Sequence, residues 1–181
     1  MTRSWNLLVL CVLIAPAQRA QERPIPQDPR MKTDVLLIVA HPDDETAVGS
    51  LLARLVIDDR KTVSIAYCNR GTGGGNSVGN EQASAMGLIR ETEARAATLS
   101  LGITNIWFLD GRDTPGQDPF GSLQEWGHGK VLEQVVRLVR LTRPEIVLTW
   151  LPHQVAGENH GDHQASGILA TEAFDLCGDP A

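Results

Sequence analysis

Short apolar runs rich in Val, Ile and Leu alternate along this chain with segments whose apolar residues recur every three or four positions. The runs have the length and composition of buried strands, and they predict β-strands at residues 35–40, 62–68, 105–109 and 145–150. The three-to-four periodicity predicts helices over about 48–56, 84–101 and 131–139, and another that begins near Asp162. The chain is therefore predicted to consist of repeated β-α-β units.

This repeat, with strands that are apolar along their whole length, predicts an α/β fold. The expected architecture is a Rossmann-like three-layer α/β/α arrangement with a mainly parallel sheet. In such sheets, ligands bind at the carboxyl ends of the strands. That rule places His41, residues 69–76, residues 110–113 and the segment after Trp150 on one rim. We expect the functional site at this rim.

The pattern differs at the N-terminus, where Arg3 precedes a short apolar stretch and Ala15-Pro16-Ala17 matches a small-residue cleavage site. This layout is typical of a secretory signal peptide, and the stretch is too short to span a bilayer stably. An uncleaved anchor or a buried helix is the alternative. We predict a secreted or periplasmic protein without a stable membrane span after cleavage, with a signal peptide at 1–17, an exposed leader at 18–32 and one domain at 33–181.

Length, net charge and cysteine content exclude few classes of function. A length of 181 residues suits one domain with a sizeable core, and a net charge of −6 argues against a nucleic-acid-binding surface. Cleavage of the signal peptide would leave Cys68 and Cys177, which could form one disulfide in an oxidising compartment. Their positions, at a strand end and near the chain end, do not favour that bond.

Charged side chains are concentrated in two clusters. His41-Pro42-Asp43-Asp44-Glu45 follows directly on the first strand, and His160-Gly161-Asp162-His163 begins the last helix. So much charge beside a hydrophobic core is costly unless a cation or a reaction uses it. Because both clusters follow strand ends, we expect them to meet at the same rim.

The two clusters together contain a set of metal ligands. A catalytic zinc ion takes three protein ligands with N or O donors and keeps one position open for water. His41 and Asp44 from the first cluster and His163 from the second form such a set. A two-histidine, one-carboxylate set can also hold Fe²⁺, as in oxygenases. Asp43, which stands next to this set, favours hydrolysis because an oxygenase has no use for that base.

The remaining residues of the clusters suit acid–base chemistry. A zinc ion lowers the pKa of bound water from about 15.7 toward about 7, and a carboxylate that is not a ligand must then take the proton. Asp43 is the candidate general base. His160, paired with Asp162, could stabilise an oxyanion or protonate a leaving amine.

Both clusters also resemble the motifs of a known family. The sequences AHPDDE and HGDH, in this order, are similar to those of the LmbE-like, or PIG-L, family of zinc-dependent N-acetylglucosaminyl de-N-acetylases, and the resemblance covers about residues 33–181. It implies a metal-dependent hydrolase that removes acetyl from a small molecule or glycan bearing N-acetylglucosamine. It also implies the same roles: metal ligands His41, Asp44 and His163, general base Asp43, and His160 with its partner Asp162 at the oxyanion.

Two further matches imply substrate-binding residues. Arg90 opens an Arg-x-x-Glu segment after a Gly-rich loop, and Asp113 follows an arginine, as in the family pattern. The resemblance therefore implies that Arg90 and Asp113 contact substrate. Relatives often have an aromatic residue at the position of Glu158, and their domain usually continues beyond the equivalent of residue 181. We accordingly expect this chain to lack the C-terminal part of the domain.

Other interpretations of these features remain open. The carboxylates after His41 could simply cap a helix, although capping explains neither His41 nor the second cluster. The Gly71–Gly75 loop lacks the third glycine of a dinucleotide-binding fingerprint and follows the second strand, so it is interpreted as a loop over the pocket. A secreted carbohydrate-binding remnant without turnover is the main alternative to an enzyme. The Fe²⁺ enzyme is less favoured.

Overall fold

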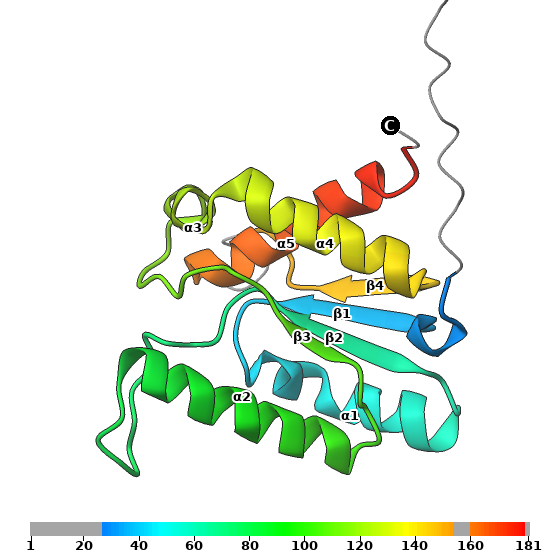
Figure 1. The fold of residues 1–181 in the computed structure, drawn as a ribbon, viewed down its shortest axis with the longest axis horizontal. Coiled ribbons are helices and arrows are strands. Elements are labelled where there is room, and N and C mark those ends of the chain that lie inside the picture. The colour runs from blue at the N-terminus through cyan, green and yellow to red at the C-terminus, as the bar shows by residue number, and fades with distance from the viewer. Residues whose placement is uncertain (1–26, 154–159, 180–181) are drawn as a thin grey trace, which may run out of the picture.

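A parallel sheet forms the centre of the protein in a computed structural model, which describes residues 27–153 and 160–179 (Figure 1). Within these residues four strands lie side by side in the order β3-β2-β1-β4, and every neighbouring pair is parallel. Their bounds are Val35–Val39 (β1), Val63–Tyr67 (β2), Ile106–Phe108 (β3) and Ile146–Thr149 (β4). Each lies inside a strand predicted from the sequence.

Helices cover both faces of this sheet (Figure 1). One layer holds α1 and α2, and the opposite layer holds α3, α4 and α5, which confirms the three-layer α/β/α fold. The bounds are Gly49–Ala53 (α1), Ala83–Ser100 (α2), Pro119–Trp126 (α3), His128–Thr142 (α4) and Gly161–Leu176 (α5). Three of the four predicted helices are confirmed as α2, α4 and α5.

The core lies on both faces of β1 because alternate side chains of this strand point in opposite directions. Leu36 and Ile38 are fully buried against the α3, α4 and α5 layer. Val35, Leu37 and Val39 pack on the other face, beside Leu52 of α1 and Ala94 of α2. All five residues of β1 are buried, as are all five of β2. The carboxyl end of β1 is thus fixed at the middle of the sheet.

Two segments differ from the prediction. The helix predicted at 48–56 is a succession of a 3₁₀ turn (Asp44–Val48), α1 and a π-helical turn (Arg54–Asp58). The helix α3 was not predicted, although its signals are present: Asp118 caps it, Pro119 occupies its first turn, and Gly127 ends it in a left-handed conformation. Its eight residues are too few for the apolar period to show.

The N-terminal predictions fall largely outside the described residues. The predicted signal peptide, 1–17, lies there entirely, and of the leader only residues 27–32 are described, including a 3₁₀ turn at Pro29–Met31. Among the helices of the described part, none is both long and apolar enough to cross a membrane. Cys68 is buried, Cys177 is half-buried, and both thiols are free.

Candidate metal centre and active site

The predicted rim contains a cavity of about 810 Å³. It opens at the carboxyl ends of the strands, where β1 leads into His41 and β4 leads toward α5. Both charged clusters line it, together with the Gly-rich loop and the segment after β3. The predicted meeting of the two clusters is therefore confirmed. The residues on its wall that carry the argument are His41, Asp43, Asp44, Arg90, Asp113 and His163.

The three residues predicted as metal ligands present their donor atoms to one another. His41 Nδ1 lies 3.0 Å from His163 Nε2, which lies 3.1 Å from Asp44 Oδ1. His41 Nδ1 and Asp44 Oδ2 are 3.8 Å apart. Donors held at 2.0–2.1 Å in a tetrahedron would be about 3.3–3.4 Å apart, so the two contacts of His163 Nε2 have a spacing close to that around one zinc ion, whereas the 3.8 Å contact of His41 reaches the other oxygen of Asp44. Two imidazoles and one carboxylate are also the ligand types that zinc takes.

The position of Asp44 is set by the turn after β1. Its Oδ2 accepts hydrogen bonds from the backbone N–H groups of Ala40 and His41, both at 2.9 Å. Burial raises the pKa of the Asp44 carboxyl, but the hydrogen bonds to His163 and His41 outweigh this effect and lower it. The carboxylate is therefore held in its ionised form, which is the form that binds a cation.

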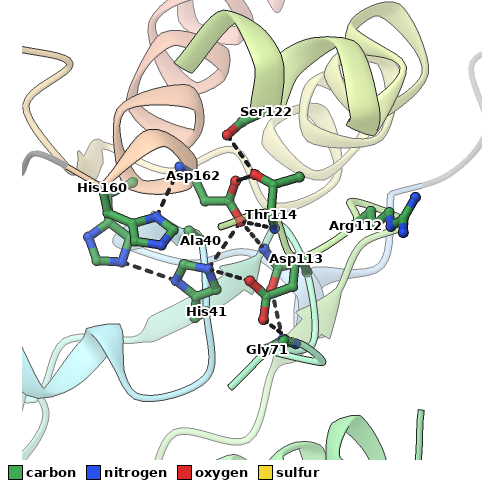
Figure 2. Close-up of polar contacts among 12 residues, drawn as sticks. Ala40, His41, Gly71, Arg112, Asp113, Thr114, Ser122, His160 and Asp162 are labelled. Carbon is green, nitrogen blue, oxygen red and sulfur yellow. Dashed lines mark hydrogen bonds and ion pairs between the residues drawn. The ribbon is translucent and has the colours of Figure 1, made fainter. Parts of the chain in front are cut away.

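The far side of the His41 ring faces two carboxylates (Figure 2). His41 Nε2 lies 3.2 Å from Asp162 Oδ2 and 3.4 Å from Asp113 Oδ1. Burial opposes charge on this imidazole, but its hydrogen bonds to Asp113, Asp162 and Asp44 raise the pKa of His41 to about 11 in the metal-free protein. A carboxylate on the nitrogen opposite the metal fixes the orientation of a ligand histidine. Asp162 and Asp113 are placed to do this.

Asp162 is itself held by groups that the sequence did not indicate. Its Oδ2 accepts from Asn69 Nδ2 at 3.1 Å and from the Thr114 backbone N–H at 3.0 Å. The Thr114 hydroxyl donates to Asp162 Oδ1 and lies 2.8 Å from the hydroxyl of Ser122 (Figure 2). Asn69 and Thr114 follow strand ends, which is the only signal that could have singled them out.

His160 contacts its predicted partner Asp162 through the backbone of that residue. Its Nδ1 accepts from the backbone N–H of Asp162 at 3.2 Å, which caps α5, while the Asp162 carboxylate contacts His41. The His160 ring centroid lies 5.1 Å from that of His41 and 4.9 Å from that of His163. The three imidazoles thus surround one point and form one group that could hold a metal ion, and His41, Asp113 and Asp162 form another.

Asp43 lies beside the ligand set in a strained backbone conformation, with φ of +120°. A non-glycine residue in such a region costs roughly 1–3 kcal/mol and persists only where its surroundings hold it. The buried Glu45 accepts from the Asp43 backbone N–H at 3.0 Å, and Arg90 Nη2 lies 2.6 Å from Asp43 Oδ2. Burial raises the pKa of Asp43 while the charge of Arg90 opposes the rise.

The two residues implied as substrate-binding also line the cavity, but the protein already engages them. Arg90 donates to the carbonyls of Pro42 and Gly71 in addition to its ion pair with Asp43. A side chain at Gly71 would collide with the Arg90 guanidinium, so this glycine lets the loop lie against it. Asp113 accepts from the backbone N–H of Gly73 at 2.7 Å. Both residues therefore connect the Gly-rich loop to the site.

Trp150, which follows β4, lies on the cavity wall. Its indole ring stacks on the imidazole of His163, with centroids 4.8 Å apart and planes 6° from parallel. Its Nε1–H donates to Asp44 Oδ2 at 3.2 Å. The residue thus contacts two of the three candidate ligands, one in each cluster.

Comparison with known proteins gives a consistent result. The model of the PIG-L family, described as GlcNAc-PI de-N-acetylase, matches residues 36–174. A 1D-myo-inositol 2-acetamido-2-deoxy-alpha-D-glucopyranoside deacetylase of Geodermatophilus obscurus is 32% identical over 163 residues, which cover 81% of this chain and 54% of that protein. One from Frankia casuarinae is 27% identical, with coverages of 81% and 52%. The chain spans about half the length of the curated relatives it matches.

Solved structures show the same fold. The N,N'-diacetylchitobiose deacetylase of Pyrococcus horikoshii superposes with a TM-score of 0.63 at 24% identity, covering 83% of this chain and 52% of the other. A conserved protein of Thermus thermophilus superposes with a TM-score of 0.59 at 28% identity, with coverages of 82% and 58%. The sheet and its helical layers are thus shared with longer proteins.

Proposed function

This chain belongs to the PIG-L family of GlcNAc-PI de-N-acetylases, and from that premise we propose that it hydrolyses the acetamide of an N-acetylated amino sugar with zinc as its metal. The observation that carries the proposal is the convergence of three candidate ligand atoms, from His41, Asp44 and His163, beside the carboxylate of Asp43 in one cavity. A ligand set with an adjacent base that is not a ligand is what metal-assisted hydrolysis requires.

In the proposed mechanism His41, Asp44 and His163 would hold the metal. The ion, when bound, polarises the acetyl carbonyl and lowers the pKa of water at its open position. Asp43 accepts a proton from the attacking water as the water oxygen bonds to the acetyl carbon. The carbon–nitrogen bond then breaks, and Asp43 returns the proton to the leaving nitrogen, so that acetate and an amine are released.

His160 is suited to stabilise the negative charge on the carbonyl oxygen. Because its Nδ1 accepts the backbone N–H of Asp162, the neutral ring carries its proton on Nε2 and can donate from there. Burial and the neighbouring His41 and His163 lower the pKa of His160, which favours this neutral form. A hydrogen bond aimed at a developing oxyanion lowers the barrier by a few kcal/mol, as mutations of such donors have shown.

The names of the relatives and the size of the cavity support a substrate class. The curated relatives are named for a glucosaminide of inositol, and about 810 Å³ is within the usual range for a small-molecule site. We therefore propose a sugar-sized N-acetylglucosaminyl conjugate as substrate. The signal-like N-terminus supports a secreted or periplasmic location, where a glycan is an accessible form of this substrate.

The test is release of acetate by the zinc-loaded protein from N-acetylglucosaminyl-inositol and from N,N'-diacetylchitobiose. Asp43→Asn should keep the metal, measured by native mass spectrometry, and should lower the rate by roughly 10²–10⁴-fold because the base is lost. Asp59→Asn, an exposed change of the same kind, is the matched control. Metal-loaded parent that binds these sugars without releasing acetate would support a carbohydrate-binding protein instead. An Asp43→Asn protein as fast as the parent would exclude the proposed base.

A further inference from the structure

Trp150 stands between the two halves of the site. It follows β4, whereas Asp44 belongs to the turn after β1 and His163 belongs to α5. Its indole nevertheless contacts both, by a hydrogen bond to Asp44 Oδ2 at 3.2 Å and by a parallel stack on the His163 ring. Trp150 thus connects the two clusters although it is not itself a candidate ligand.

The hydrogen bond completes the coordination of one Asp44 oxygen. Oδ2 already accepts the backbone N–H groups of Ala40 and His41, and the indole N–H is a third donor. All three donors bind Oδ2, whereas Oδ1 faces His163 Nε2 at 3.1 Å. The carboxylate is thereby oriented to bind a metal through Oδ1 alone.

The stack of the Trp150 indole on the imidazole orients the other candidate ligand, His163. With the ring planes 6° from parallel, the indole covers one face of the imidazole and restricts rotation of the His163 ring. Close approach of β4 and α5 makes this possible: a side chain on Gly167, one turn after His163, would meet the Trp150 carbonyl oxygen at 2.3 Å. The glycine therefore allows α5 to lie against the backbone of Trp150.

We propose that Trp150 is a positioning residue that pre-organises the metal centre by orienting Asp44 and His163 at the same time. This inference rests on the proposed function of the site. Loss of an outer partner of metal ligands typically costs roughly 10–100-fold in metal affinity. Trp150→Phe keeps an aromatic ring for the stack and loses the donor, whereas Trp150→Leu loses both, so the two variants separate the contributions.

The experiment measures zinc dissociation constants by competition with a chromophoric chelator, together with the visible spectrum of the cobalt-substituted protein, which reports ligand geometry independently of activity. We expect Trp150→Phe to raise the dissociation constant by about tenfold and Trp150→Leu to raise it by more, each with an altered cobalt spectrum. The matched control is Trp126→Phe, because this buried indole also donates a hydrogen bond, at 2.6 Å to the Arg112 carbonyl, but contacts none of the candidate ligands. The control should bind zinc like the parent.

The outcomes separate this inference from the proposed function. A parent that is folded and binds no zinc overturns the metal centre itself, and the role of Trp150 with it. A parent that binds zinc while both Trp150 variants keep its affinity and spectrum overturns the positioning role alone. Circular dichroism of the metal-free proteins establishes that the variants fold. Should Trp150→Leu not fold, the more conservative Trp150→Phe decides, and a dissociation constant and cobalt spectrum equal to those of the parent overturn the positioning role.

Discussion

The two strands that lead into the active site, β1 and β4, are both rich in Val, Ile and Leu but differ in their surroundings. β1 lies between β2 and β4 and is buried along its whole length. β4 has one neighbour in the described sheet, and Ile146 and Leu151, at its two ends, are 52% and 53% exposed. An apolar run therefore predicts a strand, but its burial depends on which neighbours the chain supplies.

This difference in burial indicates that the second cluster, residues 160–163, is held in place by the packing of α5 rather than by β4. The N-terminal part of α5 is buried, including Asp162, Gln164, Ala165 and Ser166. This helix packs against α3 and α4, and Leu169, Ala170 and Ala173 join the core on that face of the sheet. His163 is thus positioned by a helix inside the core, and Trp150 extends that support to the end of the exposed strand.

The largest expected effect follows from removing one ligand from either half. His41→Ala, after β1, and His163→Ala, on α5, should each lower zinc affinity by more than the roughly 10–100-fold that loss of an outer partner costs. Native mass spectrometry measures the metal content. His128→Ala is the control, because this exposed histidine pairs with Glu172 away from the cavity. If one variant kept the parent's affinity, the two halves would not share one ion.

Substitutions of apolar residues in β1 and in β4 should lower the free energy of unfolding by different amounts. Leu36→Ala removes a fully buried side chain of β1 and should cost about 2–5 kcal/mol of unfolding free energy. Ile146→Ala, at a half-exposed position of β4, should cost less than about 1 kcal/mol. Urea denaturation of the metal-free proteins measures both. Equal losses would mean that β4 is covered in solution by something outside the described structure.

The first motif could be recognised in the sequence because its residues are close together in the chain. His41, Asp43 and Asp44 follow one strand, and the turn that arranges them is contiguous in the chain. Asn69, Thr114 and Trp150 were missed as supporting residues because their contacts arise only when separate strands meet at the rim. The contact of the Asp162 carboxylate with His41 was missed for the same reason, since it depends on how α5 lies on the sheet.

A smaller effect is expected where α5 approaches β4. In Gly167→Ala the new methyl group would meet the Trp150 carbonyl oxygen at 2.3 Å, a backbone contact that cannot move freely. We expect a loss of about 1–3 kcal/mol together with weaker zinc binding, because His163 lies one turn away. In Gly129→Ala, on α4, the methyl group has no atom within 4 Å, and this change should stabilise by up to about 1 kcal/mol. Thermal unfolding and chelator competition measure the two consequences.

The smallest expected effect concerns the opposite end of β1, where Asp34 connects this strand to its two neighbours in different ways. Its carboxylate accepts from the backbone N–H and hydroxyl of Thr62, before β2, at 2.7 and 2.8 Å. On the β4 side, its carbonyl oxygen accepts the backbone N–H groups of Glu145 and Ile146. Asp34→Asn should therefore weaken the hydrogen bonds to Thr62 and leave those to Glu145 and Ile146 intact. We expect the free energy of unfolding to fall by about 1 kcal/mol at pH 7.

The pH dependence distinguishes this charge effect from a packing effect. The backbone and hydroxyl hydrogen bonds from Thr62 lower the pKa of Asp34 in the folded protein. A lowered folded-state pKa contributes stability above the unfolded value of about 3.9, and that contribution disappears as the pH falls through the folded value. The stability difference between Asp34→Asn and the parent should thus be constant near neutral pH and shrink below about pH 4 in urea titrations. A difference that persisted unchanged at pH 2 would show that the carboxylate acts at this end of β1 through its shape rather than its charge.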